Sequence, residues 1–146
     1  MDNIIFRPVK RKDLDEVFPL LQQLTEIDYS SRDKDDCWDR FITNNSSNSI
    51  VGIYNGKVIA YGAVVILHKI RGGRAGHIED IVVDKSVRGK NIGVRLINAL
   101  ISIAKTKGCY RVTLFCDEPL TKFYSKNGFK LFGNKVIMKN SLWDSK

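Results

Sequence analysis

One continuous stretch, residues 76–93, constrains the fold of this chain more than any other. It reads GHIEDIVVDKSVRGKNIG. The first half is rich in the β-branched residues typical of a half-buried strand, and the second half is a basic turn containing glycines. A long amphipathic helix is then expected from Asn91 or Gly93 to Lys107.

A strand, a glycine turn and a helix N-terminus in this order can form a phosphate-binding site. Backbone N–H groups converge at the turn, and the helix dipole adds about half a positive charge at its start. The stretch has no Gly-Lys-Ser/Thr at the spacing of a Walker loop. It also lacks the glycine triplet of a dinucleotide fingerprint. On this feature alone, an ordinary junction between a strand and a helix remains the alternative.

Two neighbouring carboxylates, Glu79 and Asp80, lie inside the predicted strand. Neighbours in a regular strand point to opposite faces, so both can serve one site only if the strand is distorted. A β-bulge re-aims side chains in this way and is common beside active sites. A bulge near residues 80–82 would bring the two side chains to one site. The alternative, two solvated carboxylates on an edge, fits poorly with the strongly apolar flanking residues.

The length and composition indicate one domain over residues 1–146. The chain has 146 residues, of which 43% are hydrophobic, enough for a core of its own. No apolar run approaches the roughly 20 residues of a membrane span, and the first ten residues do not resemble a signal peptide. The three cysteines lack the pairing of a metal site, so we expect reduced thiols, no metal, no membrane contact and a cytoplasmic location.

The net charge is +8, which favours anionic partners. The basic residues are dispersed, and no run of five exists. We expect a solvated surface with a subset of cations near the turn that bind anionic small molecules, and no nucleic-acid partner.

The periodicity along the chain predicts an α+β (α/β) domain with helices on both faces of a mixed sheet. Asp13 is expected to cap the first helix with Glu16 as its capping-box partner, and Asn55-Gly56 to close a hairpin. Gly108 is expected to end the long helix, which buries Val94, Ile97, Leu100, Ile101 and Ala104. The predicted strands are 4–9, 49–54, 57–67, 77–83, 111–116, 130–132 and 135–139, and the other helices are 34–41 and 120–126.

Four motifs occur in the chain in a fixed order: HIEDIVV at 77–83, RGKNIG at 88–93, GCYR at 108–111 and FYSKNGF at 123–129. With them the chain resembles the GCN5-related N-acetyltransferases (GNAT), and more narrowly their glucosamine-6-phosphate N-acetyltransferase branch. The resemblance implies the GNAT acyl-CoA N-acyltransferase fold, with a mixed, mostly antiparallel sheet of six to seven strands and helices on both faces.

The same resemblance implies a reaction. The acetyl group of acetyl-CoA, the cosubstrate, passes by direct attack in a ternary complex to the amine of D-glucosamine 6-phosphate. The products are N-acetyl-D-glucosamine 6-phosphate and CoA, on the route to UDP-N-acetylglucosamine. The resemblance also implies a homodimer whose closing strands complete the neighbour's site.

By the same resemblance, Tyr124 is the acid that protonates the departing sulfur, and Glu79 and Asp80 bind the amino sugar, with Asp80 better placed to accept a proton. His77 is interpreted as a structural hydrogen-bonding residue. The residues expected to bind acetyl-CoA are Ile81, Val82, Val83, Arg88, Gly89, Lys90, Asn91, Ile92, Gly93 and Tyr124. The residues expected to bind the sugar are Thr25, Lys69, Glu79 and Asp80.

The chain departs from the branch at a few positions. Phe115 stands where the branch has an acidic residue, with Asp117 as a possible substitute, and Leu120 stands where it has an asparagine. Two alternatives therefore stay open. One is an acetyltransferase of this fold for another small amine or a protein amine, and the other is a basic nucleic-acid-binding module without catalysis.

Overall fold

The structure is a computed structural model that describes residues 3–25 and 31–132. Its contacts divide the chain after Leu114 into two compact units. The first unit contains the sheet and three of the helices, and the second contains a short helix. Each unit is described by itself.

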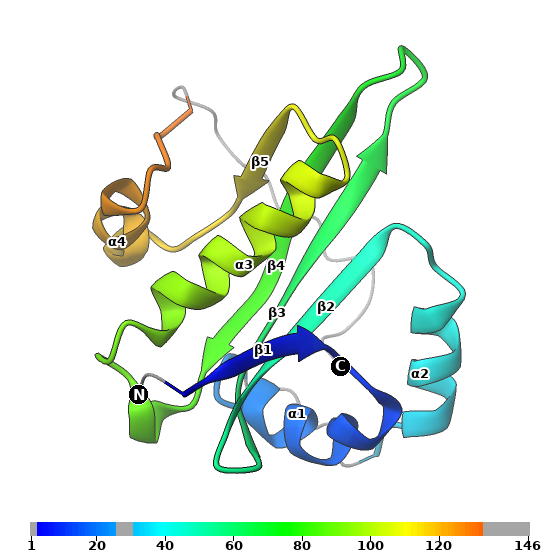
Figure 1. Cartoon of the computed structure of the whole chain (residues 1–146), viewed down its shortest axis with the longest axis vertical. Helices are drawn as coiled ribbons and strands as arrows, with labels where there is room; N and C mark the ends of the chain where they lie inside the picture. The colour runs from blue at the N-terminus through cyan, green and yellow to red at the C-terminus, as the bar shows by residue number, and fades with distance from the viewer. Residues whose placement is uncertain (1–2, 26–30, 133–146) are drawn as a thin grey trace. The chain divides into compact units, whose positions relative to one another are not determined.

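A five-stranded sheet forms the centre of the first unit, with the strands in sequence order from β1 to β5 (Figure 1). Neighbouring strands are antiparallel except β4 and β5, which are parallel. The strands are β1 (Ile5–Pro8), β2 (Ser47–Tyr54), β3 (Lys57–His68), β4 (Arg74–Val83) and β5 (Arg111–Leu114).

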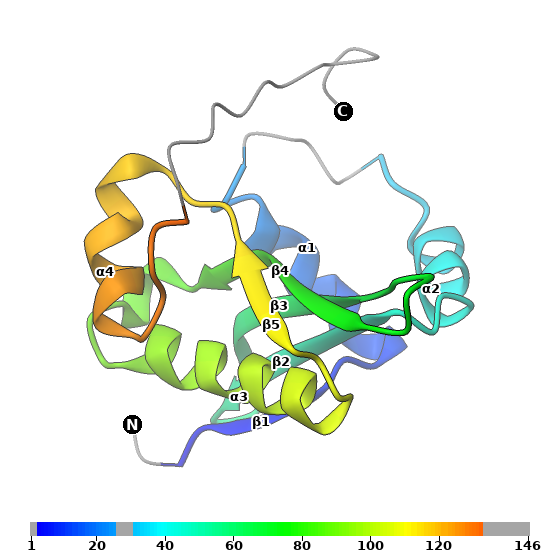
Figure 2. The same ribbon diagram turned by 90° about the horizontal axis from the view of Figure 1, so that it is seen from above.

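Helices lie on both faces of this sheet: α3 covers one face and α1 the other (Figure 2). The helices of the first unit are α1 (Leu14–Leu21), α2 (Lys34–Ile42) and α3 (Ile92–Thr106), with 3₁₀ turns η1 (Arg11–Asp13) and η2 (Lys85–Val87). The second unit holds the 3₁₀ turn η3 (Glu118–Leu120) and the helix α4 (Thr121–Lys126).

The two faces have separate hydrophobic cores. On the α3 face the helix approaches the sheet so closely that a Cβ on Gly62 would lie 3.0 Å from Leu100. On the opposite face, called the α1 face below, one cluster joins that helix to three strands. Its buried members are Val17, Leu20, Val51, Val58 and Val82.

The α+β class and most predicted elements are confirmed. The hairpin turn has positive φ at Asn55 (49°) and Gly56 (76°), as a tight two-residue turn requires, and Gly108 follows α3 with φ of 80°. Among residues 3–25 and 31–132 the sheet has five strands, where the expectation for the whole chain was six to seven. Residues 130–132 form no strand, and Leu131 and Phe132 are 80% and 76% exposed. The predicted strand 135–139 lies outside the described residues.

Two local predictions were wrong. Asp13 forms no side-chain cap on α1, because its carboxylate accepts hydrogen bonds from Arg7 (2.7 and 2.9 Å) and from the backbone N–H of Lys10 (2.7 Å). Glu16 instead accepts from the backbone N–H of Val58 at 2.8 Å. The second prediction, the buried face of α3, is confirmed for Ile97, Leu100 and Ala104 but wrong for Val94 and Ile101. These two are only half-buried, whereas Ile92 and Leu96 are buried.

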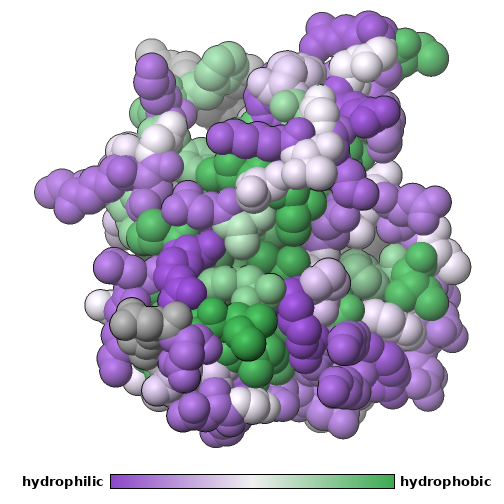
Figure 3. All heavy atoms as spheres, in the orientation of Figure 1, coloured by the Kyte–Doolittle hydropathy of each residue, from purple (hydrophilic) through white to green (hydrophobic). Residues whose placement is uncertain are grey.

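Hydrophilic side chains dominate the face shown in Figure 3, with hydrophobic ones gathered in patches between them. This distribution fits the dispersed charge of the sequence. Among the described residues, no helix is both long and apolar enough to cross a membrane.

Candidate active site

The expected bulge is present in β4. Tyr61 pairs with Val82 and Ala63 pairs with Glu79, so two residues of β4, Asp80 and Ile81, face the single residue Gly62 between them. Asp80 has φ of 55°, the left-handed region that Asp tolerates better than most residues. The bulge therefore lies directly at the carboxylate pair.

The bulge brings both carboxylates to one face of the sheet. Gly76 and Ile81 face α3, since a Cβ on Gly76 would contact Ala104 and one on Gly62 would contact Ile81. Alternation from Gly76 places Glu79 on the α1 face, and it resumes with Val82 on that face. Asp80 is the extra residue between these two, and its charge acts on Tyr61, which packs against the cluster on the α1 face.

The surroundings of Asp80 favour its protonated form. Burial of its carboxyl group, followed by the charge of Glu79, raises the pKa of Asp80 above its ordinary value. Nearby, burial raises the pKa of Tyr61, with a smaller contribution in the same direction from Asp80, while the hydrogen bond to Ser49 (2.9 Å) lowers it. A carboxylate with a raised pKa is a better proton acceptor near neutral pH.

The edge of β4 that faces β5 is open beyond the bulge. The two strands pair only from Ala75 with Arg111 to Ile78 with Leu114, while β4 continues to Val83. Within the described residues of this unit, no strand pairs with that edge from residue 79 onward. An extended ligand can hydrogen-bond to such an edge as an added strand.

The side chains along this edge belong to the core. Ile81 packs toward α3 and Val82 is 4% exposed, so these residues offer a ligand their backbone groups. At Val83, the carbonyl accepts a hydrogen bond from Nε of Arg88 at 3.1 Å.

The turn that follows presents backbone N–H groups at the start of α3. Gly89 has φ of 83° with open space where a Cβ would stand, and Asn91 has φ of 61°. No side chain caps α3, and its first turn has no acidic residue. Ile92 is 1% exposed and fixes the helix start to the core, while Lys90 is exposed. This geometry suits an anionic group such as a phosphate.

Thr25 lies close to the C-terminal end of β4. Its backbone N–H donates to Leu21 at 3.2 Å, at the end of α1. Two residues earlier, Gln23 accepts from the backbone N–H of Lys85 at 2.9 Å, which joins this end of α1 to the turn after β4.

The structure does not bring Lys69 to the carboxylates of its own chain. It follows β3, whose last residue His68 pairs with Arg74, and Asp80 lies six positions after Arg74 in β4, roughly 20 Å along the strand. There Nζ of Lys69 donates to Tyr110 Oη at 2.6 Å.

Tyr124 belongs to the second unit, in α4. Its ring packs edge-on against Phe123 and Phe129, with centroid distances of 5.1 and 5.7 Å. Burial, with a smaller effect from Cys116, raises the pKa of Tyr124, so the phenol keeps its proton at neutral pH. Phe115, which replaces the acidic residue of the branch, is 71% exposed.

Sequence reasoning missed Tyr61, which lies opposite Val82 and beside Asp80. The sequence signal that could have identified it is the presence of a tyrosine inside β3, which is otherwise almost wholly apolar. The reading of His77 as a hydrogen-bonding residue is confirmed, because its Nδ1 lies 2.9 Å from Oγ1 of Thr113.

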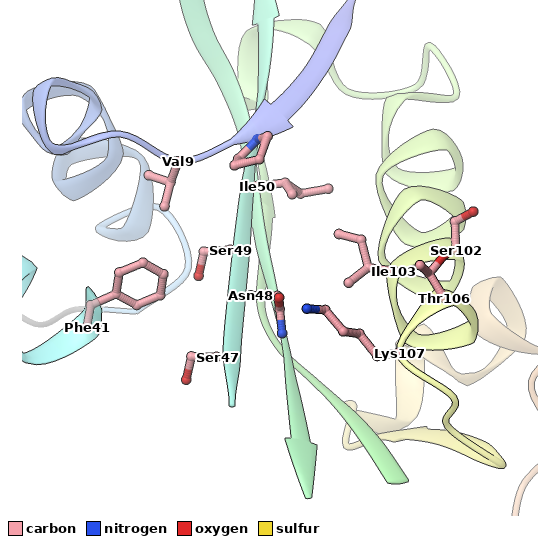
Figure 4. A pocket seen from close by; sticks show the side chains of 11 residues that line it. Val9, Phe41, Ser47, Asn48, Ser49, Ile50, Ser102, Ile103, Thr106 and Lys107 are labelled. Atoms are coloured by element: carbon pink, nitrogen blue, oxygen red, sulfur yellow. The ribbon is translucent and has the colours of Figure 1, made fainter. Parts of the chain in front are cut away.

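A cavity of about 470 Å³ lies elsewhere, between the end of β1, α2 and the C-terminal half of α3 (Figure 4). Phe41, Ile50 and Ile103 give it apolar walls, and Lys107 stands beside it. It contains none of the predicted site residues. In the part of the chain that the structure describes, no cluster of three or more His, Cys, Asp or Glu side chains could hold a metal ion.

Known proteins resemble this chain over most of its length. The chain is 40% identical over 141 residues to glucosamine 6-phosphate N-acetyltransferase 1 of Dictyostelium discoideum, covering 90% of this chain and 88% of the relative. It is 33% identical over 143 residues to glucosamine 6-phosphate N-acetyltransferase of Candida albicans, covering 90% and 93%.

The fold matches a solved structure as well. The crystal structure of glucosamine-6-phosphate N-acetyltransferase from Arabidopsis thaliana superimposes with a TM-score of 0.82 at 32% identity, over 97% of this chain and 99% of that one. The model of the acetyltransferase (GNAT) family matches residues 14–129. The chain therefore belongs to the GNAT family of acetyltransferases.

Proposed function

We propose that this protein transfers the acetyl group of acetyl-CoA to the amine of D-glucosamine 6-phosphate, giving N-acetyl-D-glucosamine 6-phosphate and CoA. The observation that carries the proposal is the bulge that aims Glu79 and Asp80 to one face, beside the unpaired edge of β4. The relatives that span most of the chain and carry this activity in their names support the choice of acceptor.

The acetyl-CoA part of the proposal uses the β4 edge and the start of α3. The backbone of Ile81, Val82 and Val83 would hold the extended arm of the coenzyme, and residues 88–93 would hold its diphosphate. The positive φ of Gly89 and the uncapped helix start fit this role, because they leave N–H groups accessible to phosphate oxygens. When bound, the coenzyme supplies an activated thioester carbonyl.

The acceptor part uses the bulge. Glu79 binds the amino sugar, and Asp80 takes one proton from the ammonium group, so that the nitrogen lone pair can attack the thioester carbon. The raised pKa of Asp80 favours this transfer. Gln23 joins the end of α1 to the turn after β4, and in this proposal Thr25, two residues further on, contributes its hydroxyl to sugar binding.

Tyr124 completes the proton balance in this proposal. It donates its proton to the sulfur as the C–S bond breaks, and the second nitrogen proton restores the phenol through solvent. Its raised pKa keeps the proton in place until the sulfur develops charge.

We also propose a homodimer in the cytoplasm. Light scattering of the purified chain tests the dimer, and a mass of one chain at micromolar concentration would contradict it.

Initial rates with a panel of amines test the acceptor. D-glucosamine 6-phosphate, D-glucosamine and a lysine peptide are compared at matched concentrations with saturating acetyl-CoA. We expect the phosphorylated sugar to have the highest kcat/KM by at least an order of magnitude, since one charge-assisted contact contributes about 1.5–3 kcal/mol. Equal values for both sugars, or a higher value for the peptide, would contradict the acceptor.

A further inference from the structure

The side chain of His77 connects β5 to the bulge on the α1 face. Its Nδ1 lies 2.9 Å from Thr113 Oγ1, and its Nε2 lies 3.2 Å from Glu79 Oε1. His77 has only 17% of its side chain exposed, whereas Glu79 has 53% exposed. A half-buried imidazole therefore connects a strand hydroxyl to an exposed carboxylate.

The strand pairing fixes the position of this connection. His77 and Thr113 are direct partners in the parallel register of β4 and β5, one pair before the pairing ends at Ile78 and Leu114. Two residues beyond Glu79, at Ile81, the edge of β4 is unpaired in the described part of this unit. The imidazole is thus held where the pairing of β4 with β5 ends, next to the proposed acceptor site.

The chemistry of the three groups selects one tautomer. An ionised carboxylate only accepts hydrogen bonds, so the nitrogen facing Glu79 must carry a proton. In the neutral imidazole, Nδ1 then has the lone pair and accepts from the hydroxyl of Thr113. The carboxylate of Glu79 thus selects the tautomer, and the hydroxyl of Thr113, which can donate or accept, supports the ring at its other nitrogen.

We propose that His77 is a positioning residue for acetyl transfer: supported by Thr113, it restrains the Glu79 carboxylate toward the acceptor amine. This inference rests on the proposed function. A glutamate exposed to solvent otherwise samples several rotamers, and restraining it beforehand removes part of the entropy cost of binding the amine.

A double-mutant cycle tests whether His77 acts through Glu79. His77→Asn keeps a polar group near Thr113 but is too short to reach Glu79. We expect it to lower kcat/KM for the amine about tenfold, within the range for a misplaced group, and to leave the KM for acetyl-CoA unchanged. In the Glu79→Gln background the same change should cause little further loss, because the restrained carboxylate is already absent.

Equal losses in both backgrounds would overturn the proposal, since His77 would then act independently of Glu79. His77→Gln, whose amide N–H can reach toward Glu79, should recover part of the lost activity. His68→Asn is the matched control for replacing a histidine and should leave the rates unchanged, because His68 is exposed at the end of β3.

A second pair of variants tests the support from β5. Thr113→Val removes the hydroxyl at nearly constant shape and should lower kcat/KM for the amine in the same direction as His77→Asn. Thr113→Ser retains the hydroxyl and should stay close to the wild type. Loss of activity in both variants to the same extent would overturn the role of the hydroxyl.

NMR of the imidazole nitrogens separates this inference from the proposed function. The chain has two histidines, so His68→Asn assigns the signals of His77. Without any substrate, the Nε2–H tautomer is expected for His77, and the Nδ1–H tautomer would overturn the positioning link. Absence of turnover with glucosamine 6-phosphate would instead contradict the proposed function, and the cycle would then use whichever amine the wild type acetylates.

Discussion

At the scale of single residues, Asp80 and Tyr124 have shifted pKa values that match their proposed roles. The pKa values of both Asp80 and Tyr124 are raised, mainly by burial in each case. For a carboxylate this shift makes a stronger base, and for a phenol it secures the acid form at neutral pH. The same physical cause therefore supports a base and an acid.

Replacing Tyr124 by Phe tests the acid. The change removes the hydroxyl but keeps the ring contacts with Phe123 and Phe129. We expect kcat to fall about 10²–10⁴-fold, as for the loss of a general acid, with the affinity for acetyl-CoA little changed. Single-turnover and steady-state rates that both match the wild type would remove Tyr124 from the mechanism.

Away from the site, the charge of Asp13 is buried and paired with Arg7, so it contributes to stability. It is 4% exposed, and its hydrogen bond to Arg7 is the main cause that lowers the pKa of its carboxyl below 3.8. Because the pKa is lowered on folding, this stabilisation is present above the unfolded-state pKa. It is lost as the pH falls through the folded-state pKa.

Asp13→Asn should therefore lower the free energy of unfolding at pH 7 by about 1.5–3 kcal/mol, the range for hydrogen bonds to charged groups. The difference from the wild type should shrink as the pH falls below the ordinary aspartate range. Urea unfolding at several pH values measures both. Asp15→Asn is the control, because Asp15 forms an exposed pair with Lys34 at 2.9 Å and should contribute little. A constant difference down to pH 2 would contradict this assignment.

At the scale of elements, β4 determines the site. Its first residues pair on both sides, its middle contains the bulge, and its end has an open edge toward β5. The conformation of Asp80 is the local condition for this arrangement, because its φ of 55° suits Asp, Asn and Gly but opposes β-branched residues.

Three substitutions at Asp80 separate charge from backbone conformation. Asp80→Asn should keep the fold stability within about 0.5 kcal/mol while lowering kcat, because Asn tolerates positive φ but cannot take the proton. Asp80→Val should destabilise the protein by about 1–2 kcal/mol or more, through strain at positive φ. Asp80→Gly keeps the conformation without the carboxylate. Thermal unfolding and kcat are measured for all three, and equal stability of the Val and Asn variants would contradict the strained bulge.

The same elements show what the sequence could and could not predict. The hairpin at Asn55 and Gly56 and the end of α3 at Gly108 follow from residues that favour positive φ, so local pattern was sufficient. The bulge was predictable because Glu79 and Asp80 can serve one site only on a distorted strand, and the family that the motifs resemble has a bulge there. The partners of Asp13 and Glu16 were not, because the competing donors Arg7 and Val58 come from other elements and only the folded chain brings them close.

At the scale of the whole molecule, the sheet positions the proposed site at the unpaired edge of β4. Five strands pair in sequence order, and the last pairing, between β4 and β5, consists of four residue pairs. The open edge, the bulge and the uncapped start of α3 follow one another along the chain from residue 79 to residue 93. Lys69 lies at the other end of β4, which sequence motifs alone could not reveal because they carry no distances.

Isothermal titration of the purified protein with acetyl-CoA tests the central claim, that the β4 edge and the start of α3 bind this coenzyme. We predict saturable binding that weakens as salt rises, because phosphate charges meet backbone donors and exposed cations. Gly89→Ala should weaken it further through strain at positive φ. No detectable heat with either acetyl-CoA or CoA, at protein concentrations of about 100 μM where micromolar affinities are measured easily, would contradict the account.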